Sequence, residues 1–168
     1  MSTSEPIERT SDGRYIVVNG RRWRATNPNI PEPLRKELVA ELMDARRAVK
    51  SAKADPEQLA RVRARVHNAK IALGERGEAW WAEATDEGQA QRATAAIMAL
   101  LSSRDPSSSI CPSEVARVIA SPKWRQAMDA VRSTADELVS LGLIRLTQGG
   151  EVIDETVESV RYALPLEN

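Results

Sequence analysis

The sequence contains few residues of the kinds that carry catalysis. Its 168 residues include one His and one Cys, which excludes an internal disulfide and a four-ligand zinc site built from these side chains. His67 lies among basic residues at helical spacing, which is typical of a solvated surface, and Cys111 is interpreted as a buried, inert thiol. Gly149-Gly150 falls between two predicted strands and opens no helix, so it is not a phosphate loop. We therefore expect a non-enzymatic protein without a cofactor or a metal.

Binding to an anion is the chemistry that the residue types favour. The chain has 24 basic and 24 acidic side chains, but residues 14–70 carry 14 basic against 6 acidic (+8), and residues 88–168 carry 8 against 10 (−2). Such a basic region attracts a polyanion through counterion release. The candidate phosphate-contacting residues are Arg21, Arg22 and Arg24 around Trp23, and Arg46, Lys50 and Lys53 on one predicted helix face. The alternative is a solvated helix surface whose cations pair with Glu37, Glu41 and Asp44.

A second candidate surface lies on the predicted helix over residues 121–141. Its outward face would carry seven polar or charged residues: Lys123, Arg125, Gln126, Asp129, Arg132, Ser133 and Asp136. The candidate DNA-contacting residues among them are Lys123, Arg125, Gln126 and Arg132. Arg and Gln side chains read base edges in the major groove, and Arg132 would hold a phosphate. The alternative is that Arg125 and Arg132 pair with acidic residues one turn away on the same helix. The predicted strand turn that follows is neutral to acidic, which is unusual for a phosphate contact.

The elements that must position the first surface are a hairpin and two helices. Residues 1–13 are polar and predict a disordered lead. Asn19-Gly20 between residues 14–18 and 21–25 predicts a β-hairpin. Apolar residues recur at helical spacing over residues 31–54 and 56–73, which predicts an antiparallel helical hairpin, the arm. Because its seam is thin, we expect the arm to dock on the β-hairpin, on the C-terminal domain, or on a second copy of itself as a homodimer. Trp80 and Trp81 are expected to anchor the arm, with a stacking surface for bases or a peptide as the alternative.

The second half predicts helices over residues 89–102, 112–119 and 121–141, the last capped by Ser121 with Pro122 in its first turn. Strands over residues 143–147 and 161–164 follow, separated by a turn at residues 148–150. This order predicts a winged helix-turn-helix. The fold class is therefore mainly α with small β elements (α+β), divided into a lead (1–13), a hairpin and arm (14–87) and a winged-helix domain (88–168).

Five stretches of this half carry a resemblance: residues 110–117, Trp124-Arg125, Met128, Val131-Arg132 and residues 142–148. Together they resemble a bacterial winged-helix-like domain family of unknown function over roughly residues 89–166. Residues 15–18, 20–24, 72–77 and 80–81 are similar to an N-terminal region that accompanies this domain. Some relatives bear the label "biopolymer transporter Tol", which the sequence does not support because it shows no export signal and no membrane span. The resemblance implies a fold and no established activity.

These features favour a cytoplasmic DNA-associated protein, with transcriptional regulation as one such role. The winged helix would supply a groove contact, and the arm a backbone contact or a dimer interface. The alternative is an adaptor in which the winged helix and the arm bind partner proteins. The expected partners are thus DNA, a protein, or a second copy of the chain, and no membrane.

Overall fold

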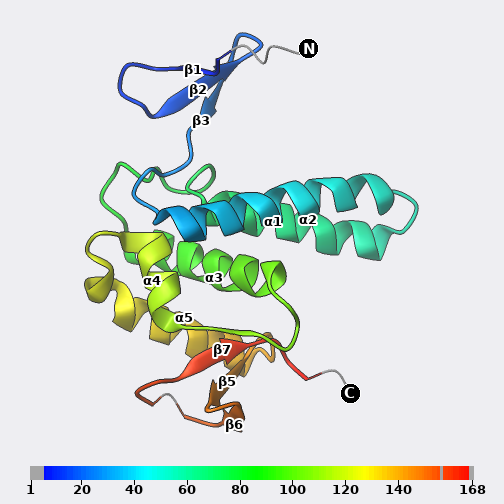
Figure 1. Cartoon of the computed structure of the whole chain (residues 1–168), viewed down its shortest axis with the longest axis vertical. Coiled ribbons are helices and arrows are strands. Elements are labelled where there is room, and N and C mark those ends of the chain that lie inside the picture. Colours follow the sequence, from blue (N-terminus) through cyan, green and yellow to red (C-terminus); the bar gives the residue numbers. More distant parts are fainter. Residues whose placement is uncertain (1–5, 156, 167–168) are drawn as a thin grey trace.

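The computed structural model describes residues 6–155 and 157–166. A small sheet lies at one end of the molecule, the arm projects sideways below it, and a second sheet lies at the opposite end (Figure 1). Helix α3 runs between the arm and the remaining helices. Within the described residues, every helix is too short or too polar to span a bilayer.

The N-terminal sheet has three antiparallel strands in the order β1 (Glu8–Arg9), β2 (Tyr15–Val18) and β3 (Arg21–Arg24). Asn19 and Gly20 both have positive φ, the backbone of the predicted tight hairpin turn. Strand β1 corrects the predicted disordered lead: Glu8 and Arg9 pair with Val17 and Ile16. The polar composition of residues 1–13 gave no sign of this strand, because β1 joins the sheet through backbone hydrogen bonds and buries no apolar side chain. The rest of the predicted lead, residues 1–5, lies outside the described residues.

The predicted helical hairpin is formed by α1 (Glu32–Ser51) and α2 (Pro56–Ala72). Asp55 starts α2, and one of its carboxylate oxygens accepts hydrogen bonds from the N–H groups of Glu57 and Gln58. Gly74 ends the arm at φ +80°, where an added Cβ would lie 3.1 Å from both Asn27 Cβ and Trp80 Cδ1. A side chain there would be strained and crowded. The base of the arm rests on α3, and dimerisation through the arm stays a prediction.

The second half contains α3 (Asp86–Ser103), β4 (Ser109–Ile110), α4 (Pro112–Ala120), the 3₁₀ helix η1 (Trp124–Ala127), α5 (Met128–Ser140), β5 (Arg145–Gln148), β6 (Glu151–Ile153) and β7 (Arg161–Ala163). The strands form an antiparallel sheet in the order β4-β7-β5-β6. The predicted helical start at Ser121 is wrong. A turn with a cis Ser121–Pro122 bond and η1 precede α5, which begins only at Met128. Strand β4 lies outside the predicted elements. Only its pairing with β7 defines it as a strand, and the local sequence does not show that pairing.

The apolar core is one cluster that runs from α1 and α2 through α3 into α4, α5 and the second sheet. Leu38, Ile97, Leu100, Val131 and Tyr162 are all fully buried in it. Side chains from both predicted domains therefore pack together, and the division at residue 88 stays a prediction. This common core fixes the arm and the second half relative to each other.

Candidate nucleic-acid interface and an adjoining cleft

The two faces of the N-terminal sheet hold different arginines. Because side chains alternate along a strand, Arg22 and Arg24 lie on the face of Tyr15, and Arg21 and Trp23 lie on the other face. Arg24 donates hydrogen bonds to the carbonyls of Gly77 (2.7 Å) and Glu78 (3.3 Å) and stacks over the Trp81 ring. Arg24 is thus tied into the fold. Its phosphate contact stays a prediction, and it would have to compete with these two hydrogen bonds.

Trp23 is 46 % exposed and lies between two cations. The Arg21 guanidinium is 5.2 Å from the ring centroid, and the Lys70 ammonium, from α2, is 5.9 Å from it. Arg22 stacks over Tyr15 at 4.5 Å on the opposite face. An exposed indole flanked by cations offers a surface for stacking and for phosphate contact.

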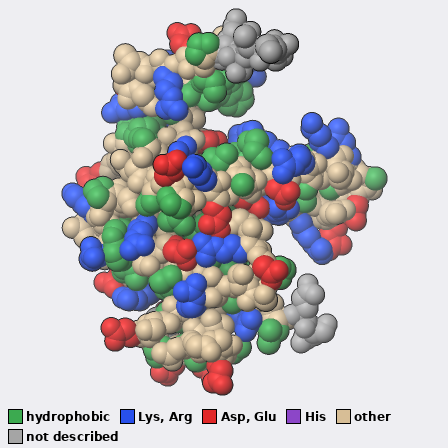
Figure 2. Space-filling view, viewed as in Figure 1, with side chains coloured by type: hydrophobic (Ala, Val, Ile, Leu, Met, Phe, Trp, Pro, Cys, Tyr) green, Lys and Arg blue, Asp and Glu red, His purple; other side chains and the backbone are tan. Residues whose placement is uncertain are grey.

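A groove between α1 and α2 continues this surface. It is lined by Arg46, Val49, Arg63, Val66 and Arg76 and has a volume of about 410 Å³. We call it the basic groove. Its three arginines have no carboxylate within 4 Å among the residues that the structure describes. In Figure 2, Lys and Arg side chains gather along the edge of the arm that faces the hairpin.

Lys70 reports the electrostatics of the basic groove. Its pKa lies below the usual lysine value, first because the side chain is partly buried and then because of the charges of Arg46 and Arg76, with Glu75 opposing the shift. Arg76 Nη1 also lies 3.0 Å from Nδ1 of the exposed His67. Positive charge therefore predominates here, and Glu75 offsets it only in part.

Other cations of the arm form ion pairs with acidic side chains, as expected if the arm is a solvated helix surface. Arg65 Nε and Nη2 each donate to the buried Glu41 at 2.8 Å, and Nη2 also contacts Asp44 at 2.7 Å. The exposed Arg61 and Arg47 pair with Glu57 and Asp44. The arm therefore has cations of two kinds, paired and unpaired.

Lys53 does not lie on the helix face predicted for Arg46, Lys50 and Lys53. Lys50 lies one turn after Arg46 on α1, as predicted. Lys53 follows the end of α1 and lies in the turn between the two helices. It does not share their helix face, because α1 ends at Ser51, earlier than the expected end of the helix.

The predicted DNA-reading residues are not gathered on α5. Lys123 precedes η1, Arg125 and Gln126 lie within it, and Arg132 is on α5 itself. Arg125 and Arg117 both stack on Trp124, at 4.4 and 4.7 Å from the ring centroid. Arg132 lies 3.5 Å from Asp129, an ion pair three residues apart of the kind expected by the alternative interpretation. All four candidates are exposed, but α5 itself carries only Arg132 of them, and its other exposed charged residues are Asp129, Asp136 and Glu137. Base reading by this face stays a prediction.

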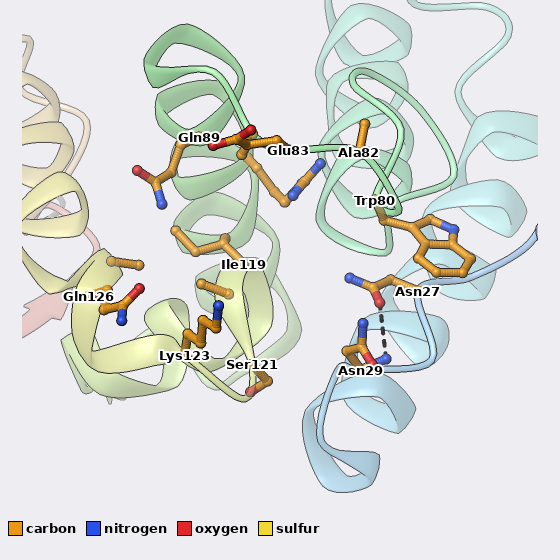
Figure 3. A pocket seen from close by; sticks show the side chains of 14 residues that line it. Asn27, Asn29, Trp80, Ala82, Glu83, Gln89, Ile119, Ser121, Lys123 and Gln126 are labelled. Atoms are coloured by element: carbon orange, nitrogen blue, oxygen red, sulfur yellow. Dashed lines mark hydrogen bonds between the residues drawn. The ribbon is translucent and has the colours of Figure 1, made fainter.

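Lys123 and Gln126 line a separate cleft at the junction of the two halves (Figure 3). The cleft has a volume of about 390 Å³. Its walls come from the segment between β3 and α1, the loop before α3, α3 itself and the α4–η1 turn. The lining residues are Asn27, Asn29, Trp80, Ala82, Glu83, Ala84, Gln89, Arg92, Ile119, Ala120, Ser121, Lys123, Gln126 and Ala127.

Trp80 and Trp81 attach the N-terminal sheet to the loop before α3, and their expected anchoring of the arm stays a prediction. Trp80 Nε1 donates to the Ala25 carbonyl at 3.0 Å, and the two indoles meet edge to face. Tyr15 packs against Trp81 at 5.5 Å between ring centroids. The N-terminal sheet is thereby fixed next to α2, where Trp23 meets Lys70. Neither ring is fully exposed, which leaves Trp23 as the tryptophan of the N-terminal region that offers a stacking surface.

Sequence reasoning missed Arg76 and Arg92. Arg76 lies beyond the end of α2. It comes close to Arg46 of α1 only because α1 and α2 pack antiparallel, which the sequence around Arg76 does not show. Arg92 did leave a signal, because it lies four residues before Ala96 on the predicted inward stripe of α3. A charged residue on a buried helix face deserves to be counted as a candidate site residue.

Residues 90–164 match a family model described as a protein of unknown function, DUF3253. The matched part includes almost all of α3 and extends past β7, and it excludes the N-terminal sheet and the arm. This agrees in position with the resemblance noted for the second half. The winged-helix identity stays a prediction, and the match gives no support to the Tol label. No curated protein matches the chain.

Proposed function

We propose that this chain is a non-enzymatic DNA-associated protein that holds the phosphate backbone in the basic groove and against Trp23. The observation that carries the proposal is the set of unpaired cations in the groove: Arg46, Arg63 and Arg76. Phosphate contacts by such side chains release condensed counterions, which drives binding without sequence preference.

The aromatic group supports the same proposal. Trp23 and Arg21 continue the basic groove onto the N-terminal sheet, and Lys70 joins the two parts. A cationic surface with an exposed indole contacts both the phosphates and the faces of exposed bases. The paired cations Arg47, Arg61 and Arg65 do not contribute in the same way, because their charges are already compensated.

The second half would have a supporting role in this function. We interpret α3, α4 and α5 with the β4-β7-β5-β6 sheet as a winged helix-turn-helix. In such a domain the last of the three helices usually enters the major groove. Here the acidic face of α5 disfavours that contact, so the expected readout by Arg125, Gln126 and Arg132 is not part of the proposal. We assign DNA contact mainly to the N-terminal half.

Protein binding by the second half is the second candidate. Near its sheet the side chains of Leu141, Leu143, Val152, Val157 and Leu166 are all exposed, with exposed fractions from 40 to 70 %. Where exposed apolar side chains form one contiguous patch, they are a feature of protein-docking surfaces. This candidate corresponds to the adaptor function and uses a different surface from the basic groove.

The test of DNA binding compares two double variants of equal charge. Arg46→Ala/Arg63→Ala removes unpaired cations, and Arg47→Ala/Arg61→Ala removes paired cations from the same two helices. Fluorescence anisotropy with a random duplex of about 20 base pairs is measured at about 50 and about 200 mM salt. We expect the first variant to bind about tenfold more weakly, with a salt slope smaller by about 2, and the second to change affinity less than about twofold.

Two outcomes contradict the proposal. One is no binding of duplex DNA at the lower salt concentration by the unmodified chain. The other is an equal loss of affinity in both variants, which would show that only net charge matters. Circular dichroism confirms that both variants keep their helical content.

A further inference from the structure

The cleft at the junction of the two halves is lined by a buried cation, Arg92, which forms no salt bridge with any residue that the structure describes. Arg92 is only 6 % exposed. Its Nη2 donates to the Glu78 carbonyl at 3.2 Å, and no other hydrogen bond or ion pair of its guanidinium exists within the described part of the chain. Burial lowers the pKa of Arg92, the charge of Glu78 raises it, and the charge of Arg24 lowers it. A buried guanidinium without a carboxylate partner is costly to the fold.

Asn27 adds a second buried donor to the cleft and is also 6 % exposed. Its Oδ1 accepts a hydrogen bond from the N–H of Asn29 at 2.9 Å, which fixes the orientation of the amide. Figure 3 shows the amide nitrogen turned away from Asn29, toward the side of the cleft that carries Lys123. Trp80 and Ile119 provide apolar wall, and Gln89 and Gln126 add further carboxamides.

We propose that this cleft binds a small organic monocarboxylate, whose carboxylate accepts hydrogen bonds from the Arg92 guanidinium and the Asn27 amide. The planar guanidinium fork matches a carboxylate in two parallel bonds. The volume of about 390 Å³ lies within the range of about 300–1,000 Å³ that small-molecule sites occupy. Glu83 also lines the cleft and repels a doubly charged phosphate, so it favours a singly charged ligand with a hydroxyl or ammonium group.

The site is distinct from the basic groove, with which it shares no lining residue. It includes the α4–η1 turn through Ser121, Lys123 and Gln126. A bound ligand would therefore contact the segment that leads into α5 and the segment that leads into the arm at the same time.

The first test measures the melting temperature of Arg92→Met without a ligand. The proposal predicts a higher melting temperature than that of the unmodified chain, because the variant removes a buried charge that only a ligand would pair. A structural role for the bond to the Glu78 carbonyl predicts a lower one. A lower melting temperature, together with an unchanged response to carboxylates, overturns the proposal.

The second test follows the Nε–H resonance of Arg92 by NMR as sodium acetate or sodium glycinate is added at constant ionic strength. Concentrations up to about 50 mM are needed, because fragments of this size bind in the millimolar range. We expect a saturable shift that is absent for acetamide and for glycinamide. Inorganic phosphate should produce a smaller shift, and a tighter response to phosphate would overturn the assignment to a monocarboxylate.

Arg117→Met is the matched control for the binding test. Arg117 is an exposed arginine that stacks on Trp124 outside the cleft, so its removal should leave the Arg92 response unchanged. Thermal shift with a panel of amino acids and hydroxy acids then ranks ligands, and Arg92→Met should abolish every stabilisation. A carboxylate response that does not saturate, or that survives in Arg92→Met, contradicts the proposal.

Discussion

Three buried polar side chains differ in how their polar atoms are satisfied. Glu41 is 3 % exposed and accepts two hydrogen bonds from Arg65. Arg92 has one backbone carbonyl partner. The hydroxyl of the fully buried Tyr162 has no hydrogen-bond partner in the described structure. Since an unsatisfied buried group costs free energy, the Tyr162 hydroxyl destabilises the fold and the Glu41–Arg65 pair does not.

We therefore expect Tyr162→Phe to raise the free energy of unfolding by up to about 1 kcal/mol at pH 7. Burial raises the pKa of Tyr162 far above its usual value of 10.0. The folded state thus disfavours the phenolate, and the native protein should lose additional stability as the pH rises above 10. Tyr162→Phe should lack this loss.

Urea denaturation at neutral pH and above pH 10 measures both effects. Thr147→Val, at a buried position in the same sheet, is the control for changes unrelated to the tyrosine, and its alkaline loss should equal that of the unmodified chain. A clear destabilisation by Tyr162→Phe at pH 7 would instead reveal a hydrogen bond to the hydroxyl.

Among the helices, strands and turns, those set by local sequence were predicted correctly, and those that depend on long-range contacts were missed. Asn19-Gly20, Asp55-Pro56 and Gly74 predicted a turn, a helix start and a helix end correctly, because each acts through its own backbone. Strand β4 was missed because two residues become a strand only through β7, more than 50 residues away. Ser121-Pro122 resembled a helix start, but Trp124–Ala127 forms a 3₁₀ helix there, with Ala127 fully buried.

In the candidate site, too, the sequence showed what is local and missed what depends on long-range contacts. The sequence identified the basic and aromatic residue types of the arm and the hairpin. It could not separate the unpaired Arg46 and Arg63 from the paired Arg65, since pairing depends on which residues of α1 and α2 face each other. The cleft was invisible because its walls come from four separate segments.

An ion-paired arginine, Arg104, links helix α1 of the arm to helices α3 and α4 of the second half. Arg104, at the end of α3, donates to Glu37 of α1 and to Glu114 of α4 at distances of 2.6 to 3.2 Å. The three side chains are between 22 and 25 % exposed. Glu114 also accepts a hydrogen bond from the N–H of Cys111 at 2.7 Å. Arg104 thus holds three helices together.

Arg104→Met should lower the free energy of unfolding by about 2–3 kcal/mol, because two partly buried carboxylates lose their common cation. Burial raises the pKa of Glu114, but the hydrogen bonds from Arg104 and Cys111 and the charge of Arg104 outweigh burial and lower it below its usual 4.5. The stabilisation is therefore present above pH 4.5 and is lost as the pH falls below it.

Chemical denaturation at pH 7 and at pH 3 tests this dependence, and the difference between the native chain and Arg104→Met should shrink at the lower pH. Arg104→Lys keeps the charge and loses the fork, so it should lie between them. A difference independent of pH would show that Arg104 acts through packing alone.

Over the whole molecule, the N-terminal sheet is held by a few specific contacts and not by the common core. Among the residues of its strands, none belongs to the core cluster. Its attachment uses Tyr15 and Arg24 on Trp81, together with the bonds from Arg24 to the carbonyls of Gly77 and Glu78. We therefore expect that the sheet can detach without unfolding the rest, and that its position beside Lys70 depends on Trp81.

Trp81→Ala should release the N-terminal sheet and weaken DNA binding, because Trp23 and Arg21 would no longer be held beside Lys70. Hydrogen exchange of residues 8–24 should rise at least about tenfold while α3 stays protected, since local opening does not require global unfolding. Trp23→Ala is the reciprocal control: the side chain is exposed, so this change should weaken DNA binding and leave exchange unaltered. If α3 also lost its protection from hydrogen exchange, the sheet and the core would unfold together. If exchange in the sheet stayed unchanged, Trp81 would not anchor the sheet.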